Sequence, residues 1–449
     1  MKKLFKVNIW IAALALLVFA SCEDDKKTDD GIDSALEADY STVSPEESKQ
    51  DVENAAVNLV SQIDELEDED GIDVMIHMMD LMGGNDAPAS AQFNIPLKAA
   101  QILADDSKNS AEVYNLLKAT TEEGLALSDS FAMLTATYTY NFETLDFDKT
   151  ENANDIVILF PGKESDLTNT AEILIGDFTV KEITEPRADF DLPAGKIEFP
   201  TGLKATLKYN DNTLMSYTLT AEYLSDGTPT ALENVLEVGS FSFTQTLKHS
   251  QYKSAGFDFS FKNGSDILIA FGAEINGDWS ENNINENSET DVEEIINNGN
   301  AYLQFMDLKA VGQIDIQTIV NGEQAFEEAH LGDSDDIKDL PEAENLVSLF
   351  TENARFVLVY TKDNTMLAYL EPYVMNNTNS YNQNGVIYTE NDYYMDMRLV
   401  FNDNSKISMD TFVENELNGF FNALNDFIYT LNTTYGTEFN EVSMDDESL

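Results

Sequence analysis

The chain has 449 residues, of which 83 are acidic and 25 are basic, and its formal net charge at neutral pH is −58. A surface this negative repels the phosphate backbone of nucleic acids and anionic lipid surfaces, which leaves divalent cations, basic proteins and neutral ligands as partners. Apolar residues make up 43% of the chain, including 26 phenylalanines, and this composition indicates a packed core rather than disorder.

The N-terminal residues 1–21 have the pattern of an export signal. Three lysines precede a short apolar run over residues 7–20, and two small residues then precede Cys22, the only cysteine in the chain. The run is shorter than the ~20 apolar residues that a membrane-spanning helix needs. This arrangement resembles the signal of bacterial lipoproteins. The resemblance implies that Cys22 becomes the multiply acylated (palmitate-bearing) first residue of the mature protein and anchors it to lipid. A cleaved secretory signal that releases a free protein with an odd thiol is the alternative.

The segment over residues 22–43 is acidic and is expected to be a flexible tether, because such a composition buries too little apolar surface to fold. Its run Glu23-Asp24-Asp25 resembles the export tag of surface lipoproteins of the Bacteroidota type. The resemblance covers only the first thirty or so residues. It implies a lipid-anchored protein of the outer membrane that faces the cell exterior.

Helical periodicity dominates residues 44–130. Ser44 and Glu47 form a capping box with Pro45 at the first helical position, which predicts a helix over 44–66. A second helix is expected over about 72–82, and two more over 97–104 and 110–118.

From Leu134 the apolar period changes to two, which predicts an antiparallel β unit over residues 131–280. Its strongest hairpin signal is Asn263-Gly264. Strands are expected over 135–142, 156–160, 172–180, 203–209, 214–223, 239–247, 257–261 and 267–275.

A second β unit is expected over residues 300–435, and an acidic tail over 436–449. The unit ends in an amphipathic helix that begins at a capping box formed by Thr411 and Glu414. The fold class is therefore α+β, antiparallel and β-rich, with a helical N-terminal region and a C-terminal amphipathic helix. The other elements expected in this unit are strands over 301–311, 314–320, 356–360, 366–374, 395–401 and 406–409, and helices over 323–331 and 341–350.

Motifs with a catalytic mechanism are missing from the sequence: it has no G-x-S-x-G, G-x-G-x-x-G, P-loop or H-E-x-x-H pattern. The three histidines lie far apart, so acid–base catalysis would depend on carboxylates, and nothing selects a pair among 83. Two functions stay open. One is a non-enzymatic binding protein or accessory subunit of an outer-membrane complex, which the scarcity of His, Cys and Trp favours. The other is a surface-displayed, glycosidase-like hydrolase that uses two carboxylates.

One local pattern is compatible with a metal site. Asp73, His77 and Asp80 fall on one face of the second predicted helix, at positions i, i+4 and i+7. Two carboxylates and one imidazole could hold a divalent cation. The commoner explanation of such a pattern is the solvated face of an amphipathic helix.

The best candidate for a binding surface is a group of tyrosines in or just beyond the Asn-rich segment 376–391, namely Tyr381, Tyr388, Tyr393 and Tyr394. Tyrosine rings beside Asn amides could form a site for a glycan, a small molecule or a peptide. In the alternative interpretation, some of these tyrosines are strand residues that pack inward.

Overall fold

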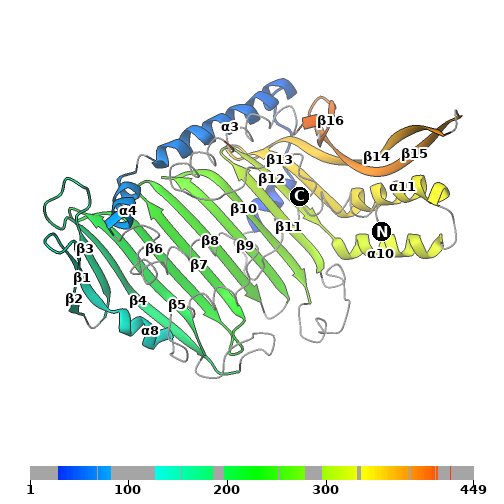
Figure 1. Cartoon of the computed structure of the whole chain (residues 1–449). Coiled ribbons are helices and arrows are strands. Elements are labelled where there is room, and N and C mark those ends of the chain that lie inside the picture. Colours follow the sequence, from blue (N-terminus) through cyan, green and yellow to red (C-terminus); the bar gives the residue numbers. More distant parts are fainter. Residues whose placement is uncertain are drawn as a thin grey trace. The chain divides into compact units, whose positions relative to one another are not determined.

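The computed structural model describes residues 29–67, 69–81, 127–152, 154–185, 197–250, 253–278, 296–330, 335–383, 386–409, 411–412 and 425. These residues divide into two compact units: unit 1 contains 29–64, 248–260 and the residues from 265 onward, and unit 2 contains 65–247 and 261–264. Strands predominate, and nearly all neighbouring strands are antiparallel (Figure 1). The antiparallel, β-rich class predicted by the period-two patterns is therefore confirmed.

Unit 2 contains seven strands and most of an eighth in the part of the chain described, in the order β2-β1-β3-β4-β5-β6-β7-β8. β1 and β3 are parallel neighbours, whereas the other neighbours from β2 to β7 are antiparallel over the residues described. The strands are β1 (Ala136–Asn141), β2 (Asp146–Glu151), β3 (Ile156–Phe160), β4 (Ala171–Ile183), β5 (Ile197–Tyr209), β6 (Asn212–Tyr223), β7 (Pro229–Val238) and β8 (Phe241–Ser250).

The core of unit 2 lies between strands and the helix α4 (Asp70–Leu81). Val74 and Met78 of α4 are buried against Ile158, Phe160 and Leu207 of the strands. The helix α8 (Leu127–Leu134) precedes β1 and contacts β4 and β5. Alternate residues of β3 are buried, as the sequence pattern predicts for a strand with one covered face.

In unit 1 the strands lie side by side in the order in which they follow one another in the chain, from β9 to β16. The last three residues of β9 belong to unit 2. Val52 of α3 is buried with Tyr360, Leu399 and Phe401, so this helix covers one part of the sheet in unit 1. The elements are α2 (Asp29–Leu36), α3 (Pro45–Glu67, whose last three residues belong to unit 2), β9 (Ser254–Asn263), β10 (Asp266–Gly277), β11 (Ile296–Phe305), β12 (Leu308–Ile314), α10 (Ile316–Ala329), α11 (Asp335–Asn353), β13 (Ala354–Tyr360), β14 (Thr365–Gln383), β15 (Val386–Phe401) and β16 (Lys406–Ser408).

The helices α3 and α4 confirm the first two predicted helices. The capping box is formed in both directions: Glu47 N donates to Ser44 Oγ at 3.3 Å, and Ser44 N donates to Glu47 Oε2 at 3.2 Å. The helices predicted over 97–104 and 110–118 lie outside the described residues, so a helical region over the whole of 44–130 stays a prediction. The signal peptide, the acidic tail and almost all of the C-terminal helix also lie outside, although Phe412 at its start is buried in the core of unit 1.

The tether predicted over residues 22–43 is wrong from residue 29 onward, because α2 occupies Asp29–Leu36. Ile32, Ala35 and Leu36 are buried against Val357 and Val359 of β13, and Ala35 is only 1% exposed. These three positions are spaced i, i+3 and i+4, which is the spacing of one helical face. The acidic composition of the whole segment hides this short stripe. Residues 22–28 lie outside the described part.

Two further predictions are corrected by the elements of unit 1. Residues 301–311 form a hairpin rather than one strand, because β11 ends at Phe305 and β12 begins at Leu308. Residues 316–320, predicted as strand, begin α10, where Asp315 caps the helix by accepting a hydrogen bond from Thr318 N at 3.0 Å. A short apolar run of this kind fits either period, and the cap decides for the helix.

Candidate functional site

The strands β14 and β15 are longer than their neighbours and pair with each other beyond the sheet. β13 pairs with β14 only as far as Tyr369, and β16 pairs with β15 only over Arg398–Val400. From Leu370 to Gln383, and from Val386 to Met397, the two strands have only each other as described strand neighbours. We call this two-stranded part the ribbon (Figure 1).

The two faces of the ribbon have different surroundings, because residues directly opposite each other in an antiparallel pair share a face. One face carries Met395 and Met397, which pack against Phe350 and its neighbours on α11. The register places the other face by its opposed pairs, which are Glu371 and Arg398, Tyr373 and Asp396, Met375 and Tyr394, and Asn377 and Asp392.

Three side chains on this second face form what we call the platform: Tyr373, Met375 and Tyr394. The Tyr394 hydroxyl lies 3.3 Å from Met375 Sδ, and the Tyr373 hydroxyl lies 3.7 Å from the same sulfur. Tyr373 also donates to Asp396 Oδ2 at 2.6 Å across the ribbon. Met375 is 37% exposed, and both tyrosines are half-buried. These contacts hold the rings in place and leave part of their surface open.

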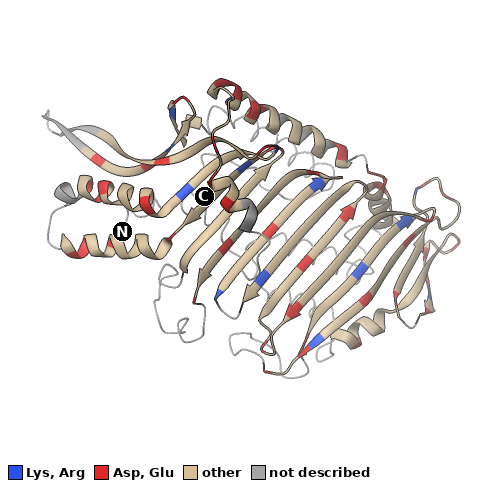
Figure 2. Cartoon of the chain, turned by 180° about the vertical axis from the view of Figure 1, so that it is seen from behind, with Lys and Arg blue, Asp and Glu red and all other residues tan. Residues whose placement is uncertain are grey.

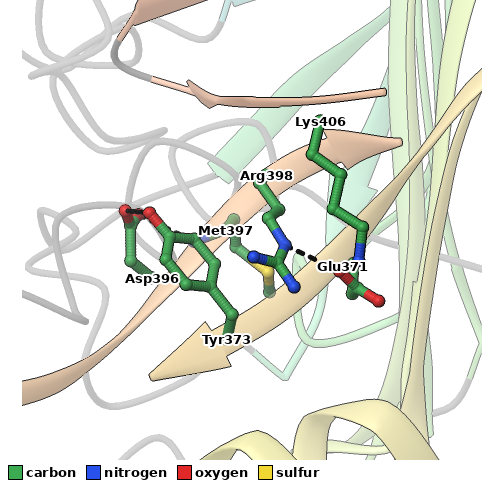
Figure 3. A network of polar contacts seen from close by, with 6 residues as sticks. All are labelled: Glu371, Tyr373, Asp396, Met397, Arg398 and Lys406. Carbon is green, nitrogen blue, oxygen red and sulfur yellow. Dashed lines mark hydrogen bonds and ion pairs between the residues drawn. The ribbon is translucent and has the colours of Figure 1, made fainter. Parts of the chain in front are cut away.

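A charged network lies at the base of the platform (Figure 3). Glu371 Oε2 accepts from Arg398 Nε at 2.6 Å and from Lys406 Nζ at 2.6 Å, and the Arg398 guanidinium stacks on the Tyr373 ring at 4.5 Å. The hydrogen bond from Lys406, followed by that from Arg398, lowers the pKa of Glu371. Both cations are therefore held by one carboxylate, and Arg398 packs on the ring of Tyr373.

The platform also has a defined donor. Burial is the main cause that raises the pKa of Tyr373, and the hydrogen bond to Asp396 adds to it. Tyr373 is therefore a neutral phenol at physiological pH, and its proton is directed at Asp396. Next to Tyr394 and Met375 in the register of this face lie Asn377, which is exposed, and Asp392, which is half-buried; they supply an amide and a carboxylate. The arrangement presents aromatic rings together with hydrogen-bonding groups, which is the composition of a ligand site.

The four tyrosines singled out in the sequence do not form one cluster in the structure. Tyr394 belongs to the platform, whereas Tyr393 lies opposite Asn376 on the other face. Tyr381 and Tyr388 occupy directly opposed positions further along the ribbon, and their side chains lie outside the described residues. The sequence prediction missed Tyr373, Met375, Asp396 and Arg398. The sequence shows the alternation on each strand, Glu371-x-Tyr373-x-Met375 and Tyr394-x-Asp396-x-Arg398, but only the register shows that the two face each other.

The metal hypothesis on α4 stays a prediction. Asp73 is exposed and His77 is half-buried, while the side chain of Asp80 lies outside the described residues. On the same helix, Met75 and Met78 pack into the core of unit 2, as expected for methionine at helical spacing. Within the described ranges, no group of three or more His, Cys, Asp or Glu side chains is arranged to hold a metal ion.

The hydrolase hypothesis requires two suitably placed acids. Among the described residues, one carboxylate is fully buried, Glu198 on β5. Its Oε2 accepts a hydrogen bond from Ser128 N at 2.8 Å, at the first turn of α8. Glu198 therefore satisfies an otherwise unpaired helix N–H, which is a structural task.

Two further findings concern the chain as described. None of the helices described is both long and apolar enough to cross a membrane. The chain matches no protein-family model, no curated protein and no solved structure.

Proposed function

We propose that the chain is a lipid-anchored protein of the bacterial outer membrane that binds an uncharged oligosaccharide on the platform of the ribbon. The observation that carries the proposal is the platform itself: two tyrosines and a methionine held in place by cross-strand contacts on a two-stranded projection. Its role is that of a non-enzymatic binding protein or accessory subunit.

The chemistry of the platform fits a sugar better than a charged ligand. The C–H face of a sugar ring packs on an aromatic ring, and its hydroxyl groups both donate and accept hydrogen bonds. Asn377 and Asp392, next to Tyr394 and Met375 in the register, supply the matching partners. A polyanionic ligand is disfavoured because acidic residues greatly outnumber basic ones (Figure 2) and because Glu371 already holds Arg398 and Lys406.

A pair of adjacent tyrosines provides the test. Tyr394→Ala removes a platform ring, and Tyr393→Ala removes its neighbour on the opposite face. The probe is a panel of neutral oligosaccharides titrated calorimetrically against the native chain. We expect the best-binding member to bind Tyr394→Ala at least tenfold more weakly, which corresponds to about 1.4 kcal/mol, and to bind Tyr393→Ala within twofold of the native chain. Binding by no member, or equal losses in the two variants, would refute the proposal.

The anchor is proposed on the sequence of the N-terminus, with Cys22 as the acylated residue. Its test is independent of the ligand. Cys22→Ala should move the protein from the membrane fraction to the soluble fraction and abolish incorporation of labelled palmitate. Protease treatment of intact cells then tests display, since a protein on the cell exterior is degraded while the cells remain whole. Unchanged fractionation of Cys22→Ala would refute the anchor and leave the platform proposal untouched.

A further inference from the structure

Two loops of unit 2 expose large apolar side chains. Leu167, in the loop between β3 and β4, is 88% exposed. Leu145 and Phe142, in the turn between β1 and β2, are 69% and 42% exposed. A single exposed leucine is ordinary, whereas several such residues in neighbouring loops indicate a contact surface.

The two loops lie at the same end of unit 2. β1 and β3 are parallel neighbours, so the turn after β1 and the loop after β3 leave the same edge of the sheet. Asn169 Nδ2 in the second loop donates to Tyr140 O at 3.0 Å, and the Tyr140 ring meets the Phe142 ring edge-on at 5.2 Å. Both views show the loops together at this end (Figures 1 and 2).

The backbone conformation of Leu145 is the strongest evidence that a leucine at this position does not serve the stability of the fold. Its φ is +57°, in the left-handed region that favours glycine and asparagine. Asn210, Asn364 and Gly264 occupy comparable positions elsewhere in the chain. Met306 is another apolar exception, but it packs against the buried core of unit 1. Leu145 is strained and exposed at once, which points to a role outside the fold.

The loop that carries Leu167 is held in one conformation by its own hydrogen bonds. Asp166 Oδ2 accepts from Lys163 N at 3.1 Å and from Thr170 Oγ1 at 2.5 Å, and Gly162 N donates to Thr170 Oγ1 at 3.0 Å. The leucine side chain is therefore presented outward by an ordered loop. A partner that binds it does not have to order the loop, which favours binding.

The surroundings of these apolar residues are acidic. Both nearby lysines are engaged: Lys163 Nζ pairs with Asp70 Oδ1 at 3.0 Å, and Lys149 Nζ lies 5.5 Å from the centroid of the Tyr138 ring. The acidic residues of the two loops and of the part of β2 nearest the turn are Glu143, Asp146, Asp148, Glu164 and Asp166. An apolar centre with an acidic rim is complementary to an apolar surface with a basic rim.

We propose that Phe142, Leu145 and Leu167 form a docking surface for a protein partner that presents apolar side chains flanked by Lys and Arg. The acidic rim repels anionic lipid headgroups, which argues against a membrane surface. A second copy of the chain carries the same strongly negative charge and is repelled as well. This surface belongs to unit 2, and the inference does not depend on the platform in unit 1.

The test is designed so that loss of binding cannot be attributed to loss of folding. Leu145→Asn replaces a strained, exposed leucine by a residue that suits the left-handed conformation, and Leu167→Ser replaces an exposed leucine by a polar residue. We expect the double variant L145N/L167S to have a melting temperature equal to or above that of the native chain.

The probe is a library of random dodecapeptides displayed on phage. Peptides are selected on the native chain, and their binding to the native chain is then compared with their binding to L145N/L167S. We expect the enriched peptides to combine Lys or Arg with Leu, Ile or Phe and to bind L145N/L167S at least tenfold more weakly than the native chain. Their affinity for the native chain should also fall in 0.5 M salt, which screens charge pairs. Leu340→Ser, which changes an exposed leucine of α11 in unit 1, is the matched control and should bind these peptides as the native chain does.

Three outcomes would overturn the inference. The first is that no enriched peptide depends on Leu145 and Leu167, and the second is that the dependent peptides lack basic residues. The third is a Leu145-dependent interaction with vesicles of one part anionic and three parts neutral phospholipid, or a Leu145-dependent dimer in sedimentation. The first outcome means that the two leucines bind no peptide, and the other two identify an occupant other than a basic protein.

Discussion

At the scale of single residues, Gly272 of β10 shows how one missing side chain allows a polar contact. It lies opposite Tyr302 in the register, and the Tyr302 hydroxyl donates to Asp258 Oδ1 at 2.9 Å. A Cβ atom at Gly272 would lie 2.4 Å from Asp258 Oδ1 and 2.6 Å from Tyr302 Cε1. Gly272→Ala should therefore lower the free energy of unfolding by about 1–3 kcal/mol, as overpacking does, when measured by chemical denaturation.

A double-mutant cycle tests whether that loss of stability comes from overpacking alone or also from a broken hydrogen bond between Tyr302 and Asp258. Tyr302→Phe removes the hydrogen bond and should cost about 1–3 kcal/mol, because the acceptor is a carboxyl group. If Gly272→Ala acts by breaking this bond, its effect in the Tyr302→Phe background is smaller than in the native chain. Fully additive effects would contradict this explanation.

Residues with a local signal could be predicted from the sequence, and residues with a tertiary role could not. The Ser44 and Glu47 cap and the Asn263-Gly264 turn depend on neighbours within a few positions, and both are confirmed. The roles of Gly272 and Tyr373 depend on which strands are neighbours, and no local pattern carries that information.

At the scale of elements, the capping box of α3 gives a matched pair of variants. Ser44→Ala removes the acceptor for Glu47 N and should destabilise the chain by about 1 kcal/mol. Ser61, exposed in the same helix, is the control, since Ala is the better helix former there and Ser61→Ala should be neutral or slightly stabilising. Thermal unfolding followed by far-UV circular dichroism distinguishes the two. Equal melting temperatures for the two variants would contradict the cap.

The helix α2 is a second test at this scale, because composition predicts a tether and the structure shows a packed element. Leu36 is buried against the valines of β13. Leu36→Ala should therefore lower the free energy of unfolding by about 2–4 kcal/mol and speed proteolysis near residue 36. A change below about 0.5 kcal/mol would mean that the helix does not contribute to the core.

Two of the missed stretches, β2 and the outer part of the ribbon, share a physical cause. β2 is an exposed edge strand that contains one apolar residue, Phe147, so no alternation is visible in its sequence. The predicted strand over 366–374 ends too early, since β14 continues to Gln383. The Asn-rich segment beyond it lacks apolar alternation, and Asn is common in turns. Cross-strand pairing holds these residues extended even though their own propensity is low.

At the scale of the whole molecule, buried tyrosines predict how stability depends on alkaline pH. Burial is the main cause that raises the pKa of Tyr40, Tyr223 and Tyr360 to about 12 each. The folded state therefore retains protons that the unfolded state loses near pH 10. This contribution is complete below about pH 10 and is lost as the pH rises toward 12.

The prediction is checked by two measurements in parallel. Absorbance at 295 nm should show a set of tyrosines that ionise only together with unfolding, and the melting temperature should fall steadily above about pH 10. Tyr223→Phe should reduce the slope of that fall. A melting temperature that does not change between pH 9 and pH 11.5 would contradict the effect of burial.

Composition and periodicity predict the class of the whole chain but not the division into units. The antiparallel, β-rich class follows from alternation that each strand carries by itself. By contrast, unit 1 joins α2 and most of α3 to residues from Lys248 onward, more than 180 residues later. Such a pairing depends on long-range packing, which no single segment of sequence specifies.

The central claim is that the platform of the ribbon binds an uncharged oligosaccharide, and hydrogen exchange tests it most directly. Amide exchange would be followed by mass spectrometry on the native chain, with and without the best-binding member of the neutral panel. The account predicts slowed exchange in peptides that cover Glu371–Asn377 and Asp392–Arg398, and unchanged exchange in the turn between β1 and β2. Protection elsewhere, with none on the ribbon, would contradict it.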